Sequence, residues 1–355
     1  MAYTTIDDPS AYFHIQLYTG TGSSQSITND ANAGDFKPDW IWAKNRSDDA
    51  GHIAFDSSRG VNKNLTVNST DAEATVTTQV TAFNTDGFTM GSNNGANGSS
   101  DSLVAWQWKA NGGTTSTNTA GTNIDTTVQA NTTAGFSIMT YTGTGTDNDS
   151  IGHGLGAVPH WIIVKNRDES NGWQIYHHKN TSAPETDYLN LNSTNATQDD
   201  SDRWSDQAPS STVITLGGND GVSKSSVKYV CYAFTEIQGY SKFGGYTGNG
   251  NADGAFIYLG FKPAWLLVKQ TDGADNWQLV DNKRDPINLV DAFLMPDTSS
   301  AENTHDNNIQ VDFLSNGFKC RNTNSVFNGS GNSYIYMAFA EHPFVSSKGV
   351  PTTAR

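Results

Sequence analysis

A peptide pattern that occurs three times along the chain constrains its fold more than any other sequence feature. The pattern Tyr-Thr-Gly-x-Gly begins at Tyr18, Tyr141 and Tyr246. Each copy is followed by a Pro-x-Trp run, whose tryptophans are Trp40, Trp161 and Trp265. Each copy ends in an aromatic-rich run, which closes at Trp108, Phe234 or Phe339. Three matches in one order indicate three copies of a domain-sized unit, far longer than a solenoid repeat of roughly 20 to 45 residues.

The composition of each copy predicts strands. Short β-branched and aromatic runs alternate with Gly, Asn, Asp and Pro, and no long segment shows the apolar period of a helix. The Pro-x-Trp runs are apolar on both faces, which we interpret as the middle of a two-sheet sandwich. The predicted fold is all-β, with three tandem antiparallel β-sandwich domains of a lectin-like or jelly-roll type. The side chains expected in the structural core are Trp40, Trp161, Trp265, Trp106, Phe234 and Phe339.

The repeats also predict the domain boundaries. The first sandwich, with an N-terminal arm, is expected over residues 1–113, the second over 135–239 and the third over 240–346. Residues 114–134 are rich in Gly, Thr and Asn and offer few side chains for a core, so they are predicted to be a linker. Residues 347–355 are expected to form a polar C-terminal tail.

The charge balance excludes several classes of partner. Asp and Glu outnumber Lys and Arg by 36 to 21, which gives a net charge of −15. A field of this sign repels nucleic-acid phosphates and anionic lipids, so no nucleic-acid partner is expected. No apolar run is long enough for a membrane span, and Asp7 and Asp8 lie where a signal peptide has basic residues. We therefore expect neither membrane insertion nor secretion by that route. Cys231 and Cys320 are expected to be buried free thiols.

The sequence contains no recognisable catalytic motif. Its histidines show no metal-ligand spacing, and its glutamates are few. Glu236 and Glu341 occupy corresponding places after two closing strands, which favours a repeated structural role. The acidic runs 147–149 and 199–202 could supply oxygen ligands to Ca²⁺, but neither has the loop and closing glutamate of an EF-hand. We predict no enzyme and no cofactor, with at most weak, adventitious calcium binding.

Three residues are predicted to contact a ligand or a neighbouring subunit. Trp204 lies in a polar loop and has no counterpart in the other copies, unlike the repeated tryptophans. Its amphipathic ring would suit a sugar face. His177 and His178 follow a strand-like run and are expected as a surface pair at a strand end. Their rings should point to opposite sides, so they are not expected to share a metal.

Three runs resemble a family of repeat proteins found in marine bacteriophages. They span Tyr3 to Phe13, Phe36 to Arg46 and Ala338 to Phe344. The resemblance extends over all three copies. It implies an exposed, lectin-like β-sandwich component of the virion, either in the tail fibre apparatus or as an outer capsid decoration. It implies no catalytic residue.

These observations favour a virion structural protein of tail fibre or adhesin type that mediates attachment to the host surface. The alternatives are a capsid decoration protein, of knob or cement type, without a receptor role, and a polysaccharide depolymerase. The expected partners are other virion proteins, host-surface glycan and further copies of the chain, with a homotrimer favoured. Salt should strengthen self-assembly because it screens the repulsion between acidic chains. The expected location is the virion, after synthesis in the host cytoplasm.

Overall fold

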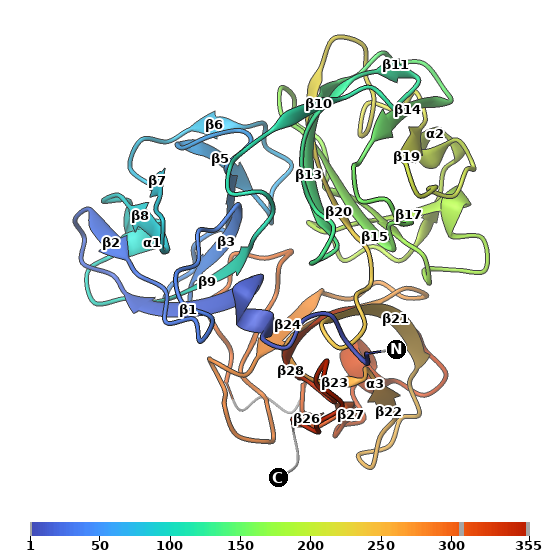
Figure 1. The fold of residues 1–355 in the computed structure, drawn as a ribbon. Helices are drawn as coiled ribbons and strands as arrows, with labels where there is room; N and C mark the ends of the chain where they lie inside the picture. The colour runs from blue at the N-terminus through green and yellow to red at the C-terminus, as the bar shows by residue number, and fades with distance from the viewer. Residues whose placement is uncertain (1, 305–308, 353–355) are drawn as a thin grey trace.

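The three copies form three β-sandwiches, which lie as three lobes around a common centre (Figure 1). Their named strand pairs are antiparallel, except for the parallel pair of β11 (Asn123–Ile124) and β14 (Asp149–Gly152). The computed structural model describes residues 2–304 and 309–352. Strands make up 40% of the chain and helices 5%. The predicted all-β fold with several antiparallel sandwiches is confirmed.

The first sandwich pairs a six-stranded sheet with a three-stranded sheet. In order across the large sheet, the strands are β1 (Phe13–Thr19), β9 (Ser102–Trp108), β3 (Trp40–Asn45), β4 (Ile53–Asp56), β5 (Lys63–Thr66) and β6 (Ala74–Thr75). Across the small sheet they are β2 (Gln25–Ile27), β8 (Phe88–Met90) and β7 (Val80–Phe83). The short helices are η1 (Pro9–Ala11) and α1 (Asn94–Asn97).

The second sandwich has the largest sheet, with eight strands. They are β10 (Ser116–Asn118), β12 (Thr126–Asn131), β13 (Phe136–Thr142), β20 (Lys228–Phe234), β15 (Trp161–Asn166), β16 (Gln174–His177), β17 (Asp187–Asn190) and β18 (Gln198–Asp199). Its small sheet contains β11 (Asn123–Ile124), β14 (Asp149–Gly152) and β19 (Val213–Leu216). The short helices are η2 (Pro184–Thr186) and α2 (Ser201–Trp204).

The third sandwich has the same strand order as the first, with fewer strands in its large sheet. The large sheet contains β21 (Ser241–Thr247), β28 (Ser333–Pro343), β23 (Phe261–Gln270), β24 (Gln278–Asp281) and β25 (Phe293–Leu294). The small sheet contains β22 (Phe256–Tyr258), β27 (Gly317–Cys320) and β26 (Val311–Leu314). The short helix is α3 (Ser325–Asn328).

The segment 114–134, predicted to be a linker, is instead part of the second sandwich. Its strand β12 pairs with β13 and its strand β11 pairs with β14, so the segment covers the edges of both sheets. Ile124 and Val128 are buried in the core of this sandwich. The composition was misleading because backbone pairing, together with these few apolar side chains, is enough to order the segment.

The central strands of each large sheet are buried on both faces. Along β3, Ile41 and Ala43 belong to the core of the first sandwich, whereas Trp40 and Trp42 belong to a core shared by all three sandwiches. Strands β15 and β23 alternate in the same way. The six predicted core residues, Trp40, Trp161, Trp265, Trp106, Phe234 and Phe339, are all buried in the shared core.

The sequence predicted the burial of these tryptophans but assigned them to the wrong layer. A two-sheet sandwich buries only one face of each sheet, so a strand that is apolar on both faces needs a further layer. The neighbouring sandwiches supply this layer. Trp40 of the first sandwich stacks on Tyr232 of the second, with ring centroids 4.5 Å apart. Phe339 of the third stacks on Phe13 of the first at 4.9 Å and packs against Phe234 of the second at 6.0 Å.

The N-terminal arm crosses from the first sandwich to the third. Tyr3 Oη donates to the carbonyl of Gly260 at 2.8 Å and lies 3.3 Å from Tyr258 Oη. Asp7 accepts the backbone N–H of Ser347 at 2.6 Å. The arm therefore adds a connection between the first and third sandwiches.

Cys231 and Cys320 are free and buried, as the sequence predicted. They lie in the cores of the second and third sandwiches. Within residues 2–304 and 309–352, no helix is long and apolar enough to cross a membrane.

Candidate functional site

The three boundaries between sandwiches are built from equivalent positions, but they differ in charge. The last residues of β4, β16 and β24 pair with the repeated tryptophans Trp40, Trp161 and Trp265, and they are Asp56, His177 and Asp281. Three residues further along the chain are Arg59, Asn180 and Arg284. Two boundaries therefore carry an Asp–Arg pair, and the third carries histidine and asparagine.

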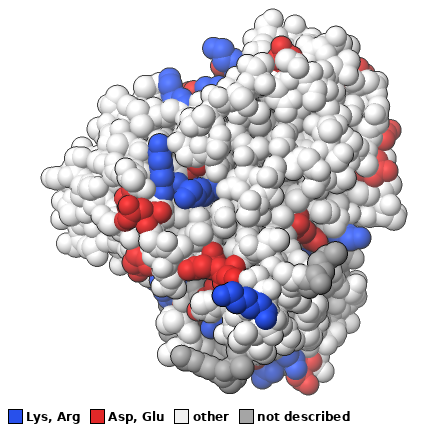
Figure 2. Space-filling model, viewed as in Figure 1, with Lys and Arg blue, Asp and Glu red and all other residues white. Residues whose placement is uncertain are grey.

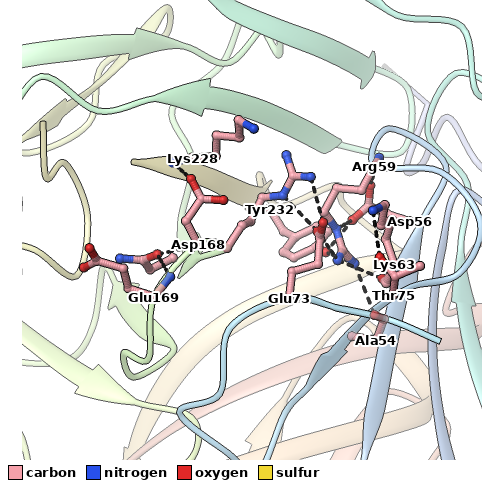
Figure 3. Close-up of polar contacts among 12 residues, drawn as sticks. Ala54, Asp56, Arg59, Lys63, Glu73, Thr75, Asp168, Glu169, Lys228 and Tyr232 are labelled. Carbon is pink, nitrogen blue, oxygen red and sulfur yellow. Dashed lines mark hydrogen bonds and ion pairs between the residues drawn. The ribbon is translucent and has the colours of Figure 1, made fainter. Parts of the chain in front are cut away.

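The boundary between the first and second sandwiches is held by a buried ionic cluster (Figure 3). Arg59 Nε lies 2.5 Å from Asp56 Oδ2, and Arg59 Nη1 lies 3.0 Å from Glu73 Oε2. From the second sandwich, Arg167 Nε lies 2.9 Å from Glu73 Oε2, and Tyr232 Oη donates to Asp56 Oδ2 at 2.7 Å. Buried charges are tolerated only when they are paired, so the two sandwiches depend on each other here.

The boundary between the third and first sandwiches repeats this cluster. Arg284 Nε lies 2.5 Å from Asp281 Oδ2, and Arg284 Nη1 lies 2.7 Å from Glu302 Oε2. From the first sandwich, Arg46 Nη2 lies 2.6 Å from Glu302 Oε1, and Trp106 Nε1 donates to Asp281 Oδ2 at 3.0 Å. The third sandwich therefore presents to the first the same charges that the first presents to the second.

The boundary between the second and third sandwiches has neutral groups at these positions. The backbone N–H of Thr197 donates to Thr271 O at 2.8 Å, and its hydroxyl donates to Asn180 Oδ1 at 2.6 Å. His177 Nε2 lies 3.3 Å from Tyr336 O. Burial lowers the pKa of His177 well below its ordinary value, so the ring is neutral. Among the described residues, this boundary therefore has no ionic cluster like those of the other two.

We expect acid to weaken the two charged boundaries selectively. Burial raises the pKa of Glu73 and of Glu302, but the paired arginines outweigh it, and both pKa values lie below the ordinary 4.5. A carboxyl group whose pKa is lowered in the folded state stabilises the fold at pH values above its unfolded-state pKa. This stabilisation is lost as the pH falls through the folded-state pKa. The double variant Glu73→Gln, Glu302→Gln should therefore show a smaller loss of unfolding free energy between pH 7 and pH 3 than the parent chain.

Urea unfolding at the two pH values measures this difference. Glu185→Gln is the matched control, because Glu185 belongs to η2, outside both clusters. Its pH dependence should follow that of the parent chain. An equal loss in the double variant and the parent would contradict the role assigned to the two glutamates.

A buried lysine lies at the same place in each large sheet. Lys44, Lys165 and Lys269 each donate to backbone carbonyls, and burial lowers the pKa of each to about 8. Lys165 also reaches across the boundary to the carbonyl of Thr70 in the first sandwich, at 3.0 Å. Because carbonyl oxygens inside the fold hold each ammonium group, we assign these lysines a structural role.

An open groove of about 720 Å³ lies at the boundary between the second and third sandwiches. One wall is the turn after β16, with His178 to Asn180, and the other consists of β21, β22 and part of β28 in the third sandwich. Ligand sites commonly have volumes of roughly 300 to 1,000 Å³. In the second sandwich the edges that correspond to β21 and β22 are covered by β12 and β11. In the third sandwich these edges line the groove.

Two exposed aromatic rings at the groove depart from the repeat. Phe256 and Tyr258 of β22 are 47% and 49% exposed. Between them, Ile257 is buried and pairs with Phe318, just as Ile27 of β2 pairs with Phe88. The residues equivalent to the two rings are Ser26 and Thr28 in the first sandwich and Ser150 and Gly152 in the second. Large rings therefore replace small side chains only in the third copy.

The floor of the groove also departs from the repeat. Gly244 of β21 pairs with Tyr336 of β28, where the other copies pair Gln16 with Ala105 and Met139 with Cys231. A Cβ atom on residue 244 would overlap the ring and hydroxyl of Tyr336. Gly244 thus leaves room for the Tyr336 hydroxyl, which lines the groove without a hydrogen bond to any described residue.

Polar side chains at the groove fix its edge strand. Glu236 Oε1 accepts the backbone N–H of Phe243 at 2.9 Å, and His178 Nε2 lies 2.6 Å from Phe243 O. Burial lowers the pKa of His178. Lys242 Nζ donates to Tyr258 O at 2.9 Å and lies 5.4 Å from the Tyr258 ring centroid. The backbone N–H and the backbone carbonyl of Phe243 are therefore both held by side chains.

The structure separates the three residues predicted to bind a ligand. Trp204 is 1% exposed, packs against Tyr176 in the core of the second sandwich, and donates its indole N–H to Asp187 O at 3.0 Å. It has no counterpart because α2 packs on β19, the last strand of its small sheet. His177 is buried against Trp161. Only His178 lies at the groove, so the predictions of ligand contact for Trp204 and His177 are wrong.

The acidic loops considered for calcium bond within the chain. Asp147 Oδ1 accepts the N–H of Gly218 at 2.6 Å, Asp149 accepts the side-chain amide of Asn123 at 2.8 Å, and Asp200 caps α2. In the described part of the chain, no group of three or more His, Cys, Asp or Glu residues could hold a metal ion. On the face shown in Figure 2, charged side chains are sparse and both signs are interspersed.

Comparison with known protein families gives a match over most of the chain. Residues 8–343 match the family DUF7483, described as a domain of unknown function. The match spans all three sandwiches. No curated protein and no solved structure matches the chain.

Proposed function

We propose that this chain, which belongs to the DUF7483 family, is a structural attachment protein of a bacteriophage particle, with the groove of the third sandwich as its contact with the host surface. The observation that carries the proposal is the confinement of three departures from the repeat, Phe256, Tyr258 and the pair Gly244–Tyr336, to one open groove. The shared aromatic core and the two ionic clusters make the ring of sandwiches a rigid support for that groove. The resemblance of the repeats to virion proteins supports the proposed location on the particle.

The groove supports binding better than hydrolysis. Glu236 is the one carboxylate among the described lining residues, and it is engaged with the Phe243 backbone. Glycosidases generally need two carboxyl groups that face each other across the substrate. A polysaccharide depolymerase is therefore the least favoured of the three functions, and release of reducing ends from host-envelope glycan would revive it.

Capsid decoration without a receptor role is the second candidate. One feature favours it: the three similar sandwiches form a quasi-threefold ring within one chain, which would suit a threefold position of a shell. Assembly into a homo-oligomer, with a trimer favoured, stays a prediction. The contacts between chains would have to use the outer surfaces of the sandwiches, because the inner faces of the large sheets are already buried.

Competition for adsorption distinguishes the two candidates. An excess of the purified chain should slow adsorption of the intact phage to its host cells, because the chain would occupy the surface receptors. A decoration protein would leave adsorption unchanged and would bind purified particles that lack it. Binding to neither cells nor particles would overturn the proposal.

A further inference from the structure

We propose that the ligand of the groove is an oligosaccharide, whose pyranose faces stack on Phe256 and Tyr258 and whose hydroxyl groups reach Tyr336. This inference rests on the proposed function and names the ligand class of the same site. It is carried by the side chains that distinguish this groove from the equivalent places in the other two sandwiches.

The two exposed rings form a platform on one strand. Phe256 and Tyr258 alternate with the buried Ile257, so both project from the solvent-facing side of β22. The C–H groups of a pyranose face pack well on an aromatic ring, which is both apolar and rigid. Tyr3 and Lys242 restrain the second ring, through a contact of 3.3 Å to Tyr258 Oη and a cation–π contact at 5.4 Å. The platform is therefore held in place before a ligand arrives.

The Tyr336 hydroxyl, at the floor of the groove, can make a polar contact with the ligand. Tyr336 is 2% exposed, yet its hydroxyl reaches the groove over Gly244. A hydroxyl at the groove can both donate to and accept from a ligand hydroxyl. At the rim, Thr247, Ser333 and Lys179 are exposed and offer further hydrogen-bonding groups.

Charge distinguishes between the two classes of ligand that stack on aromatic rings, sugar chains and nucleic acids. The described lining residues include two lysines, Lys179 and Lys242, and one carboxylate, Glu236, so the charge of the lining is nearly balanced. Nucleic-acid bases also stack on aromatic rings, but the net charge of −15 disfavours a phosphate chain. A neutral sugar chain meets no such repulsion, and a chain with occasional carboxylates meets less of it than a phosphate chain does.

Binding of defined oligosaccharides to the purified full-length chain tests the inference. We would use neutral glucose-based and galactose-based hexasaccharides in one arm and oligogalacturonate in the other, with titration by saturation-transfer NMR and calorimetry. At least one probe should bind. Phe256→Ser and Tyr258→Thr, which install the side chains of the first sandwich, should each weaken that binding about tenfold, the size expected for loss of one aromatic contact.

Three further variants make the test specific. Tyr258→Phe should keep the affinity within about twofold, because the ring does the stacking, and Tyr336→Phe should weaken binding several-fold through loss of one hydroxyl. Ile287→Ser is the matched control, because Ile287 is 75% exposed and lies outside the groove. Its affinity should equal that of the parent.

The outcomes separate this inference from the proposed function. Failure of every probe to bind, or equal binding by Phe256→Ser and the parent, would overturn the oligosaccharide assignment. Loss of a chain dimer in Phe256→Ser, detected by sedimentation, would overturn it in favour of a contact between copies. Sugar binding that persists while the chain fails to slow phage adsorption would overturn only the proposed function.

Discussion

Replacement of Trp40 by alanine should destabilise the chain by about 3 to 5 kcal/mol, the usual cost of removing a large buried aromatic side chain. Trp40 is 1% exposed and stacks on Trp108 of its own sandwich at 4.4 Å and on Tyr232 of the second sandwich at 4.5 Å. The cavity would open between two sandwiches rather than within one. We therefore expect amide protection to fall in both β3 and β20, as measured by hydrogen exchange together with denaturant unfolding.

Trp204→Ala provides the matched comparison. Trp204 is also 1% exposed, but it lies in the core of the second sandwich alone. Its replacement should cost a similar free energy, while the loss of protection stays within the second sandwich. Protection of β20 that is unchanged in Trp40→Ala would show that the shared core is not a cooperative link between the sandwiches.

The repeat and its strands could be predicted from the sequence because both are local patterns. Tyr-Thr-Gly-x-Gly and Pro-x-Trp recur in order, and β-branched and aromatic runs between turn residues indicate strands. The shared core could not be predicted in the same way. Which layer buries the second apolar face of β3 depends on how the domains pack, and the pattern of Trp40 to Asn45 shows only that both faces are buried.

Departures from the repeat are the sequence signal for function, but they have two causes. Trp204 departs because it fills the core beside the last strand of a small sheet, which a repeat comparison cannot distinguish from a ligand contact. Phe256 and Tyr258 depart at positions where the other copies have small side chains, so comparison of the β22 position in all three copies could have found them. What separates the two cases is exposure, and exposure requires the fold.

The change from Asp-x-x-Arg to His-x-x-Asn in the second copy could also be found by aligning the three copies in the sequence. Asp56 and Arg59 correspond to Asp281 and Arg284, whereas the second copy has His177 and Asn180. The sequence does not show that each pair lies at a boundary between sandwiches. The partners Glu73 and Arg167 come from different copies, and their distance of 2.9 Å follows only from the arrangement of the three lobes.

Arg59→Asn should cost about 3 to 5 kcal/mol, because it leaves buried carboxylates without their cation. The Arg59 and Asp56 side chains have no exposed area, and Glu73 would keep only Arg167. A fourfold variant would install the neutral residues of the boundary between the second and third sandwiches. It carries Asp56→His, Arg59→Asn, Glu73→Thr and Arg167→Thr. This variant should lose less unfolding free energy than Arg59→Asn alone. Removing a whole buried ionic cluster is less costly than removing one partner, and the chain already uses the neutral set at an equivalent place.

Denaturant unfolding of the two variants, with Arg321→Met as control, measures this difference. Arg321 lies near Asp253 and Asp312 on the surface, with 37% of its side chain exposed, so its loss should cost no more than about 1 kcal/mol. If Arg59→Asn costs no more than Arg321→Met, the cluster does not stabilise the boundary. If the fourfold variant is the least stable of the three, the charged and neutral sets are not interchangeable, and the charges would then be required where the first sandwich meets the second.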